Sequence, residues 1–146
     1  MSGRTKPAEN GIATLADWKA FLAEKGPVDY LDAVFVDICG TIRGKRFPVS
    51  EAEKVFTSGI QMPRSLYFLD VTGVNEDIHG MGFSDGDPDS LSWPVKGTLQ
   101  LVPWADQPHA QVFMTMFEED GAPCELEPRN VLKRVLARFQ EKGWQP

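Results

Sequence analysis

Residues 28–49 read VDYLDAVFVDICGTIRGKRFPV and carry the clearest strand pattern of the chain. Residues 28–36 are rich in β-branched and aromatic side chains, and residues 42–49 form a second run of extended character. Between the two runs, residues 37–41 read DICGT, a composition that is typical of a turn. The stretch therefore predicts a β-hairpin.

Three helices are predicted around this hairpin. Thr14 is a suitable N-cap for a helix that ends near residues 26–27. Ser50 and Glu53 form a capping-box pattern at the start of a second, short helix. Pro128 favours the start of a third helix. The apolar residues of this third helix share one face and require a partner surface: Val131, Leu132, Val135, Leu136 and Phe139.

Two more strands are predicted at residues 97–102 and 110–117, and a short strand at residues 65–69. Residues 1–13 are polar and small, and we expect them to be a frayed lead-in. The elements then follow the order helix, hairpin, helix, loop, two strands, helix. This order predicts an α+β fold, with a mixed sheet of four to five strands and helices on one face.

Residues 65–95, which we call the acidic segment, contain carboxylates but neither lysine nor arginine. The acids are Asp70, Glu76, Asp77, Asp85, Asp87 and Asp89. The segment predicts a long surface loop, and such loops are usually functional or disordered. Its apolar and aromatic residues argue against disorder. We therefore expect an ordered loop that faces a cation: a metal ion, an ammonium group or a basic patch on a partner.

The composition is that of an ordinary globular protein, with 42% hydrophobic and 25% charged residues. The length of 146 residues fits one domain, or one domain and a fragment of another. A net charge of -6 argues against a nucleic-acid surface. No apolar run reaches the length needed to span a bilayer, so we expect no membrane association. Two cysteines form no disulfide framework, and we expect a cytoplasmic protein with reduced thiols.

Calcium binding is the first chemistry that the acidic segment suggests. Asp85, Asp87 and Asp89 match the first three ligand positions of an EF-hand loop. The match then fails, because Ser90 stands where the turn needs glycine and Lys96 where the ion needs a bidentate glutamate. We therefore expect no metal site, and aspartates that bond to their own backbone instead.

The other reactive side chains do not make a complete active site in the sequence. The histidines and cysteines have nothing nearby that pairs them: His79, His109, Cys39 and Cys124. Neither of the common glycine-rich phosphate-binding motifs is present. The basic residues at 43–46 can either grip an anion or protect an edge strand from pairing, and the sequence leaves both interpretations open.

Six short motifs, in the same order along the chain, resemble the glutamine synthetase superfamily over residues 28–139. They are DICG with RGKRFP at 37–48, LDVTG at 69–73, SDGDPD at 84–89, PW at 103–104, DG at 120–121 and PRNVLKR at 128–134. Within the superfamily, the second and third motifs look most like the glutamate–putrescine ligase branch. Ammonia-using members more often carry Asp-Gly-Ser-Ser at the second motif, followed by a tryptophan that residues 74–78 lack. The resemblance therefore leaves the amine open.

The resemblance implies a domain organisation. Residues 27–122 would be the N-terminal β-grasp domain of such an enzyme, preceded by a tail and helix at residues 1–26. Residues 123–146 would be the first helix of a truncated catalytic domain. In the family, subunits form a ring, and each active site lies between this small domain and the catalytic domain of the adjacent subunit. The partner of this chain would thus be a second copy of the full-length protein.

The resemblance also implies an ATP-dependent ligase that joins the side-chain carboxylate of glutamate to ammonia or to an amine such as putrescine. ATP and Mg²⁺ (or Mn²⁺) would bind to the full-length enzyme and not to this fragment, which should be inactive alone. By its match to the family motif, Asp70 would bind the ammonium form of the amine and take up or relay its proton. Thr72 and Gly73 would shape the loop, and Asp85 would be a secondary cation contact.

A different interpretation is a free-standing β-grasp module that presents the acidic segment to a basic partner and catalyses nothing. The apolar face of the third helix separates the two interpretations. A free module should not end in a helix with five unpartnered apolar residues, so this helix favours a fragment of a larger enzyme.

Overall fold

A computed structural model describes residues 11–146 and contains a mixed sheet, three α-helices and two short 3₁₀ helices. In chain order the elements are α1 (Leu15–Lys25), β1 (Tyr30–Val36), β2 (Ile42–Pro48), α2 (Val49–Thr57), β3 (Ile60–Pro63), η1 (Arg64–Tyr67), η2 (Ile78–Gly80), β4 (Asp89–Pro94), β5 (Gln100–Leu101), β6 (His109–Phe117) and α3 (Pro128–Glu141). No helix in this described part is long and apolar enough to cross a membrane.

The sheet is organised around β6, its longest strand. The strand order is β2-β1-β6-β4-β3, and β5 pairs with β6 beside this path. The predicted hairpin is confirmed: β1 and β2 are antiparallel, and Tyr30 pairs with Pro48. The pairing of β1 with β6 is parallel, and it places Asp32 opposite Gln111. All other pairings are antiparallel, so the sheet is mixed.

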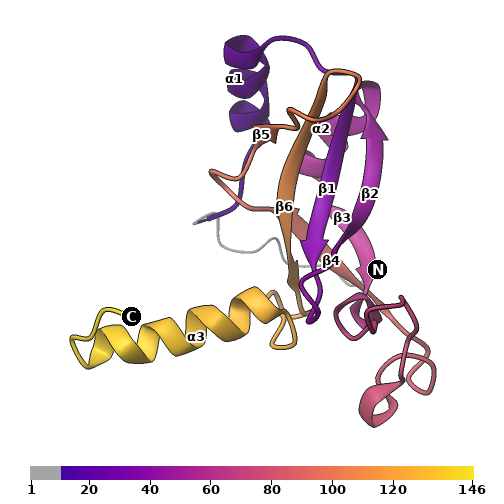
Figure 1. The fold of residues 1–146 in the computed structure, drawn as a ribbon, viewed down its shortest axis with the longest axis vertical. Helices are drawn as coiled ribbons and strands as arrows, with labels where there is room; N and C mark the ends of the chain where they lie inside the picture. The colour runs from indigo at the N-terminus through magenta and orange to yellow at the C-terminus, as the bar shows by residue number, and fades with distance from the viewer. Residues whose placement is uncertain (1–10) are drawn as a thin grey trace.

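One face of the sheet is covered by α1 and α2, which lie at the upper end of the molecule in Figure 1. Alternate residues of β1 and β6 point into this core, where Trp18 of α1 stacks on Phe56 of α2 with ring centroids 5.4 Å apart. The strand residues of the core are Leu31, Ala33, Phe35, Ala110, Val112, Met114 and Met116. The α+β class and the β-grasp-like mixed sheet are confirmed, and with β5 the sheet has one strand more than the expected maximum.

The acidic segment is less loop-like than predicted. Its last part forms β4, which pairs with β3 on one side and β6 on the other. Trp93 is 4% exposed and lies in the protein interior. The strand expected at residues 65–69 is wrong, because Arg64–Tyr67 is a 3₁₀ helix. Because β4 contains serines and a proline, its residues have a weak strand propensity and do not show a strand pattern. The strand forms because it is buried between two neighbouring strands, and this burial outweighs its weak propensity.

Three smaller predictions are also wrong. Ser50 is not an N-cap: α2 begins at Val49, directly after the extended Pro48, so Ser50 already lies in the first turn. The strand expected at residues 97–102 is reduced to Gln100–Leu101. The expectation that residues 11–13 are frayed is wrong, because the Ala13 N–H donates to the Pro94 carbonyl at 2.7 Å. Residues 1–10, on which the rest of this expectation falls, lie outside the described part.

Helix α3 projects sideways from the lower end of the sheet and does not pack on the face that α1 and α2 cover (Figure 1). Its apolar stripe is exposed, with 42% of Val131, 56% of Leu132 and 42% of Val135 accessible. The sequence-based expectation of an unpartnered third helix thus holds for the chain as it stands.

Candidate functional site

The predicted site residues belong to the segment between β3 and β4, which lies at the lower end of the molecule in Figure 1, away from α1 and α2. Two turns meet there. The first is the β1–β2 turn, residues 37–41. The second, which we call the Asp70 turn, spans residues 69–75 and is closed by a bridge between Leu69 and Asn75. The N–H of Ile38 donates to the carbonyl of Tyr67 at 3.3 Å, and this bond joins the β1–β2 turn to the end of η1, just before the Asp70 turn.

Asp70 organises the turn that carries its name. Its Oδ1 accepts hydrogen bonds from the N–H groups of Thr72 and Val74, both at 2.8 Å. The Thr72 hydroxyl lies 2.8 Å from Oδ1 and 3.0 Å from Oδ2. Gly73 has φ +88°, a left-handed conformation that suits glycine. Three of the four predicted site residues are therefore brought together in one turn.

The Asp70 carboxylate is ionised at neutral pH. The N–H of Val74 and then the hydroxyl of Thr72 hold its pKa below the usual value, because hydrogen bonds to the charged form favour that form. Only one hydroxyl bonds to Oδ2, so this oxygen retains acceptor capacity for a cation. The turn can therefore bind an ammonium group through a charge-assisted hydrogen bond.

Arg43 and Asp37 support this turn, and the sequence did not assign a role to their pairing. Arg43 donates from Nε to Asp37 Oδ2 at 2.6 Å and from Nη2 to the Asp70 carbonyl oxygen at 3.0 Å. The Asp37 side chain is fully buried. Burial alone would raise the pKa of Asp37, but hydrogen bonds from Arg43 and from the Thr41 and Cys39 N–H groups outweigh burial and hold it low. Both members of the pair are thus charged.

The other aspartates of the acidic segment bond to groups both near and far along the chain, and the expectation that the calcium-like aspartates bond to their own turn holds for Asp85 but not for Asp87. Asp77 accepts bonds from the Phe83 and Ser84 N–H groups and from the Ser84 hydroxyl. Asp87 accepts from the N–H and hydroxyl of Ser65. By hydrogen bonding alone, Asp77 resembles Asp70. The attachment to the β1–β2 turn through Arg43 distinguishes Asp70 from it.

Asp85, the fourth predicted site residue, is not joined to the Asp70 turn. Its Oδ1 accepts from the N–H groups of Gly82 and Asp87, and its Oδ2 lies 3.7 Å from Arg64. The Gly82 and Asp87 N–H groups are the main reason that the pKa of Asp85 is lowered. Within residues 11–146, no hydrogen bond or ion pair links Asp85 to Asp70. Its role as a second cation contact stays a prediction.

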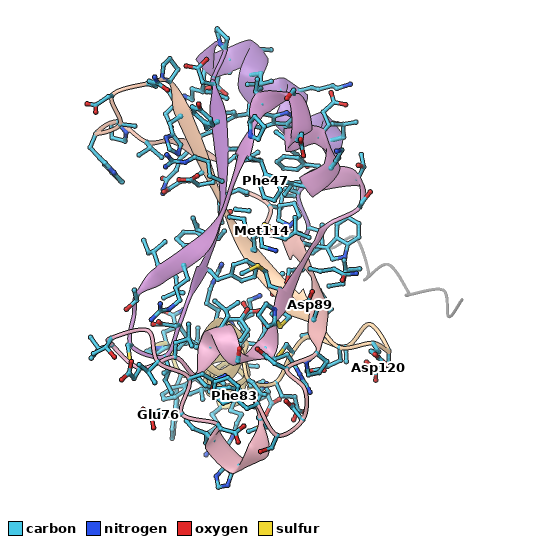
Figure 2. The ribbon with its side chains drawn as sticks, turned by 90° about the vertical axis from the view of Figure 1, so that its right-hand side faces the viewer. Phe47, Glu76, Phe83, Asp89, Met114 and Asp120 are labelled. Carbon is cyan, nitrogen blue, oxygen red and sulfur yellow. The ribbon has the colours of Figure 1, made fainter. Side chains whose placement is uncertain are left out.

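Two acids of the segment keep free carboxylates. Glu76 and Asp89 are exposed, and no described side chain or backbone group forms a hydrogen bond or ion pair with either carboxylate. Figure 2 shows Glu76 and Phe83 in the lower part of the molecule, away from Phe47 and Met114 of the sheet. Phe83 is 71% exposed and lies among acids. This end of the molecule is therefore acidic, open and partly apolar.

No group of three or more histidine, cysteine, aspartate or glutamate side chains in the described residues is arranged to hold a metal ion. His109 has a partner that could not be inferred from the sequence, because the two residues are far apart along the chain. Its Nε2 lies 2.7 Å from Asp32 Oδ2, across the parallel pairing of β1 and β6. Cys39 is exposed, whereas Cys124 is buried, and burial raises the pKa of the Cys124 thiol to about 11.

Two of the surface hollows lie elsewhere on the described part of the chain. One, of about 640 Å³, is lined by charges of both signs from the β6–α3 connection and α3, including Glu118 and Arg134. The other, of about 570 Å³, lies on the uncovered face of the sheet and includes Asp32, Arg46 and His109. Neither is lined by Asp70, Thr72, Gly73 or Asp85. Residues 71–74 of the Asp70 turn are exposed, so the turn lies open on the surface of the described part of the chain.

Comparison with known proteins identifies relatives of this chain, although no family model matches it. The chain is 36% identical over 138 residues to gamma-glutamylputrescine synthetase PuuA of Escherichia coli. The aligned part covers 93% of this chain and 29% of that enzyme. It is 30% identical to a glutamate–isopropylamine ligase of a Pseudomonas species, over 83% of this chain and 27% of the ligase. A glutamine synthetase of Staphylococcus epidermidis is 33% identical, over 84% of this chain and 25% of that protein.

Solved structures agree at the level of the fold. A novel glutamine synthase homolog matches with a TM-score of 0.65 and 20% identity, over 80% of this chain and 28% of that protein. A GmaS/ADP complex matches with a TM-score of 0.61 and 25% identity, over 84% of this chain and 25% of that protein. The chain thus spans between 25% and 29% of the length of the curated relatives described above. The relatives of this chain are thus members of the glutamine synthetase superfamily, and the chain shares with them a part that makes up about a quarter of their length.

Proposed function

We propose that this chain is the amine-binding part of an ATP-dependent ligase that joins the side-chain carboxylate of glutamate to an amine. Putrescine or a related polyamine is the substrate we favour, because the most informative relatives include a gamma-glutamylputrescine synthetase and a glutamate–isopropylamine ligase. The observation that carries the proposal is the Asp70 turn: an ionised, accessible carboxylate in a chain related to amine-using ligases.

The chemistry assigned to Asp70 follows from the charge of the substrate. An aliphatic amine arrives as an ammonium ion and must lose a proton before it can attack an activated carboxyl group. Asp70 Oδ2 would bind the ammonium by a charge-assisted hydrogen bond. When a neighbouring surface covers the turn, loss of water raises the pKa of the carboxylate, which can then accept the proton. Thr72 and Gly73 would keep the carboxylate in position.

The rest of the active site would lie outside this chain. We propose that the catalytic domain holds ATP and Mg²⁺ (or Mn²⁺). No cluster of side chains in residues 11–146 is arranged to hold a metal ion, so the residues of this chain would take no part in ATP or metal chemistry. The exposed stripe of α3 and the open Asp70 turn both support a larger assembly. In this proposal residues 123–146 begin the catalytic domain, and the catalytic domain of the adjacent subunit in a ring-shaped homo-oligomer completes the site.

The proposal is tested by steady-state kinetics of the full-length ligase with Asp70→Asn. The substitution removes the negative charge and keeps the size, so we expect kcat/KM for the amine to fall on the order of 100-fold, with an unchanged KM for glutamate. Glu76→Gln removes the same charge from a carboxylate without partners and serves as the matched control, with near-normal kinetics expected. Similar kinetics for both variants, whether impaired or normal, would contradict the role of Asp70.

A further inference from the structure

Arg43 occupies an unusual place for a basic residue, because its guanidinium lies beneath a turn proposed to bind a cation. Three observations describe this place. Nε donates to Asp37, Nη2 donates to the main-chain carbonyl of Asp70, and Nη1 lies 3.5 Å from the point where a side chain at Gly73 would begin. The Arg43 side chain is 22% exposed. The guanidinium thus lies against the main chain of the Asp70 turn at both Asp70 and Gly73.

The charge of Arg43 is neutralised within the protein. Asp37 Oδ2 accepts from Arg43, and Asp37 Oδ1 accepts the N–H groups of Cys39 and Thr41 at 2.9 and 2.8 Å. The buried carboxylate is therefore itself fixed by the β1–β2 turn. A fixed carboxylate orients the planar guanidinium fork, whose nitrogens keep rigid relative directions. Because the pair is neutral overall, Asp37 weakens the repulsion between Arg43 and an ammonium ion bound to the Asp70 turn.

The point of attachment on the Asp70 turn is equally informative. Arg43 bonds to the carbonyl oxygen of Asp70 and leaves both carboxylate oxygens to the turn and to a ligand. The bond spans 27 residues of sequence and joins an edge strand of the sheet to the acidic segment. An arginine that served only to neutralise Asp37 would not need this second bond.

From this geometry we propose that Arg43 is a positioning residue for amine use: held by Asp37, it fixes the main chain of Asp70 and thereby the direction of the Asp70 carboxylate. The inference rests on the proposed function, because a positioned carboxylate matters only if Asp70 binds the amine. It also resolves the two interpretations that the sequence left open for this basic stretch. At Arg43 the role is neither anion binding nor edge protection alone.

Arg43→Lys separates the two bonds of Arg43. The single ammonium group of lysine can neutralise Asp37 but cannot also reach the Asp70 carbonyl in the geometry of the fork. We expect the variant to fold with a melting temperature close to that of the unmodified protein. Arg46→Lys is the matched control on the same strand, since Arg46 pairs with Asp32 and makes no bond to the acidic segment.

The first measurement is hydrogen exchange of the Val74 amide, which donates to Asp70 Oδ1 in this chain. Arg43→Lys should speed this exchange about tenfold, and Arg46→Lys should leave it unchanged. The second measurement is the kinetics of the full-length ligase. Arg43→Lys should raise the KM for the amine about tenfold, whereas the KM for glutamate and the rate of acyl-phosphate formation should stay normal.

The outcomes separate the inference from the function on which it rests. Faster exchange together with a raised amine KM supports the inference. Unchanged exchange of the Val74 amide overturns it, whatever the kinetics. If Asp70→Asn impairs amine use but Arg43→Lys does not, the inference is wrong and the proposed function stands. If neither variant alters amine use, the proposed function fails and the inference fails with it.

Discussion

At the scale of single residues, the hydroxyl of Thr72 is the side-chain contact that contributes most to keeping the Asp70 carboxylate charged. It lies within hydrogen-bonding distance of both carboxylate oxygens, at 2.8 and 3.0 Å. After the Val74 N–H, it is the largest cause of the lowered pKa of Asp70. A carboxylate with a low pKa binds cations well over a wide pH range, but it accepts a proton only after its surroundings change.

Thr72→Val should therefore raise the pKa of Asp70 toward the usual value for aspartate. Valine keeps the β-branched shape of threonine and removes only the hydroxyl. The measurement is a carbon-13 NMR titration of the Asp70 carboxyl group. Thr57→Val, which removes a hydroxyl that bonds to Glu53 in α2, is the control and should leave this titration unaltered. If the Asp70 carboxyl titrates unchanged in Thr72→Val, the Thr72 hydroxyl does not lower the pKa of Asp70.

The pH dependence of folding stability that Asp70 contributes follows from the linkage between proton binding and folding. Because the pKa of Asp70 is lower in the folded protein than in the unfolded chain, its turn is stabilised above the unfolded pKa. This contribution is lost as the pH falls through the folded pKa. Amine binding through Asp70 should be lost in the same acidic range, since a protonated carboxyl no longer attracts an ammonium ion.

At the scale of the elements, Glu127 joins α3 to the sheet. Its side chain is fully buried, and Oε2 accepts bonds from the Thr115 hydroxyl at 2.9 Å and from the Met116 N–H at 2.8 Å. Asn130 of α3 bonds to the Cys124 carbonyl at 3.0 Å and secures the same connection. The start of α3 is thus fixed on β6, although the rest of the helix projects from the body.

Glu127→Gln should stabilise the protein at pH values above the folded pKa of Glu127. Burial raises the pKa of Glu127, more than the Met116 N–H and the Thr115 hydroxyl lower it. A raised pKa means that stability is greatest below the unfolded pKa and falls as the pH rises through the folded pKa. Glutamine keeps the shape without the charge, so the gain should be about 1.4 kcal/mol for each unit by which the pKa is raised.

The measurement is the free energy of unfolding in urea between pH 4 and pH 9 for this variant and for Glu125→Gln. Glu125 is exposed and lies two residues away, so its variant should follow the unmodified protein across the range. A Glu127→Gln protein that is less stable at every pH would show that the charged form of Glu127 supports the fold.

How far the sequence predicts these elements depends on the range of the contacts that form them. The β1–β2 hairpin was predictable because two apolar runs flank a local turn. β4 was not, since its four inner residues read SLSW and it exists only because β3 and β6 pair with it. The second helix was predicted, but its cap was not, because the helix begins directly after Pro48 and the N-cap lies two residues before Ser50.

The same limit applies to the candidate site. The Asp-x-Thr-Gly motif identified the Asp70 turn, whose main bonds span two to four residues. The bond from Arg43 to Asp70 spans 27 residues, and the pairing of His109 with Asp32 spans 77. No local pattern encodes such contacts, because they depend on where the loop and the parallel strands finally lie. The supporting residues of the site therefore emerged only from the structure.

At the scale of the whole molecule, the net charge and the exposed surfaces both fit the proposed function. The net charge of -6 favours the approach of a cationic amine, and the segment between β3 and β4 lies at the lower end of the molecule in Figure 1, away from α1 and α2. The apolar stripe of α3 and the open Asp70 turn are both surfaces that other parts of an enzyme can cover. The relatives are more than three times as long as the segment they share with this chain.

The central claim, that Asp70 acts on the amine and not on glutamate activation, is tested most directly by a single-turnover chase. The full-length ligase forms acyl phosphate from labelled glutamate and ATP without amine, and amine is then added and the amide followed over time. We predict that Asp70→Asn forms acyl phosphate at the normal rate but converts it to amide on the order of 100-fold more slowly. Equal slowing of both steps, or a normal chase, would contradict the account.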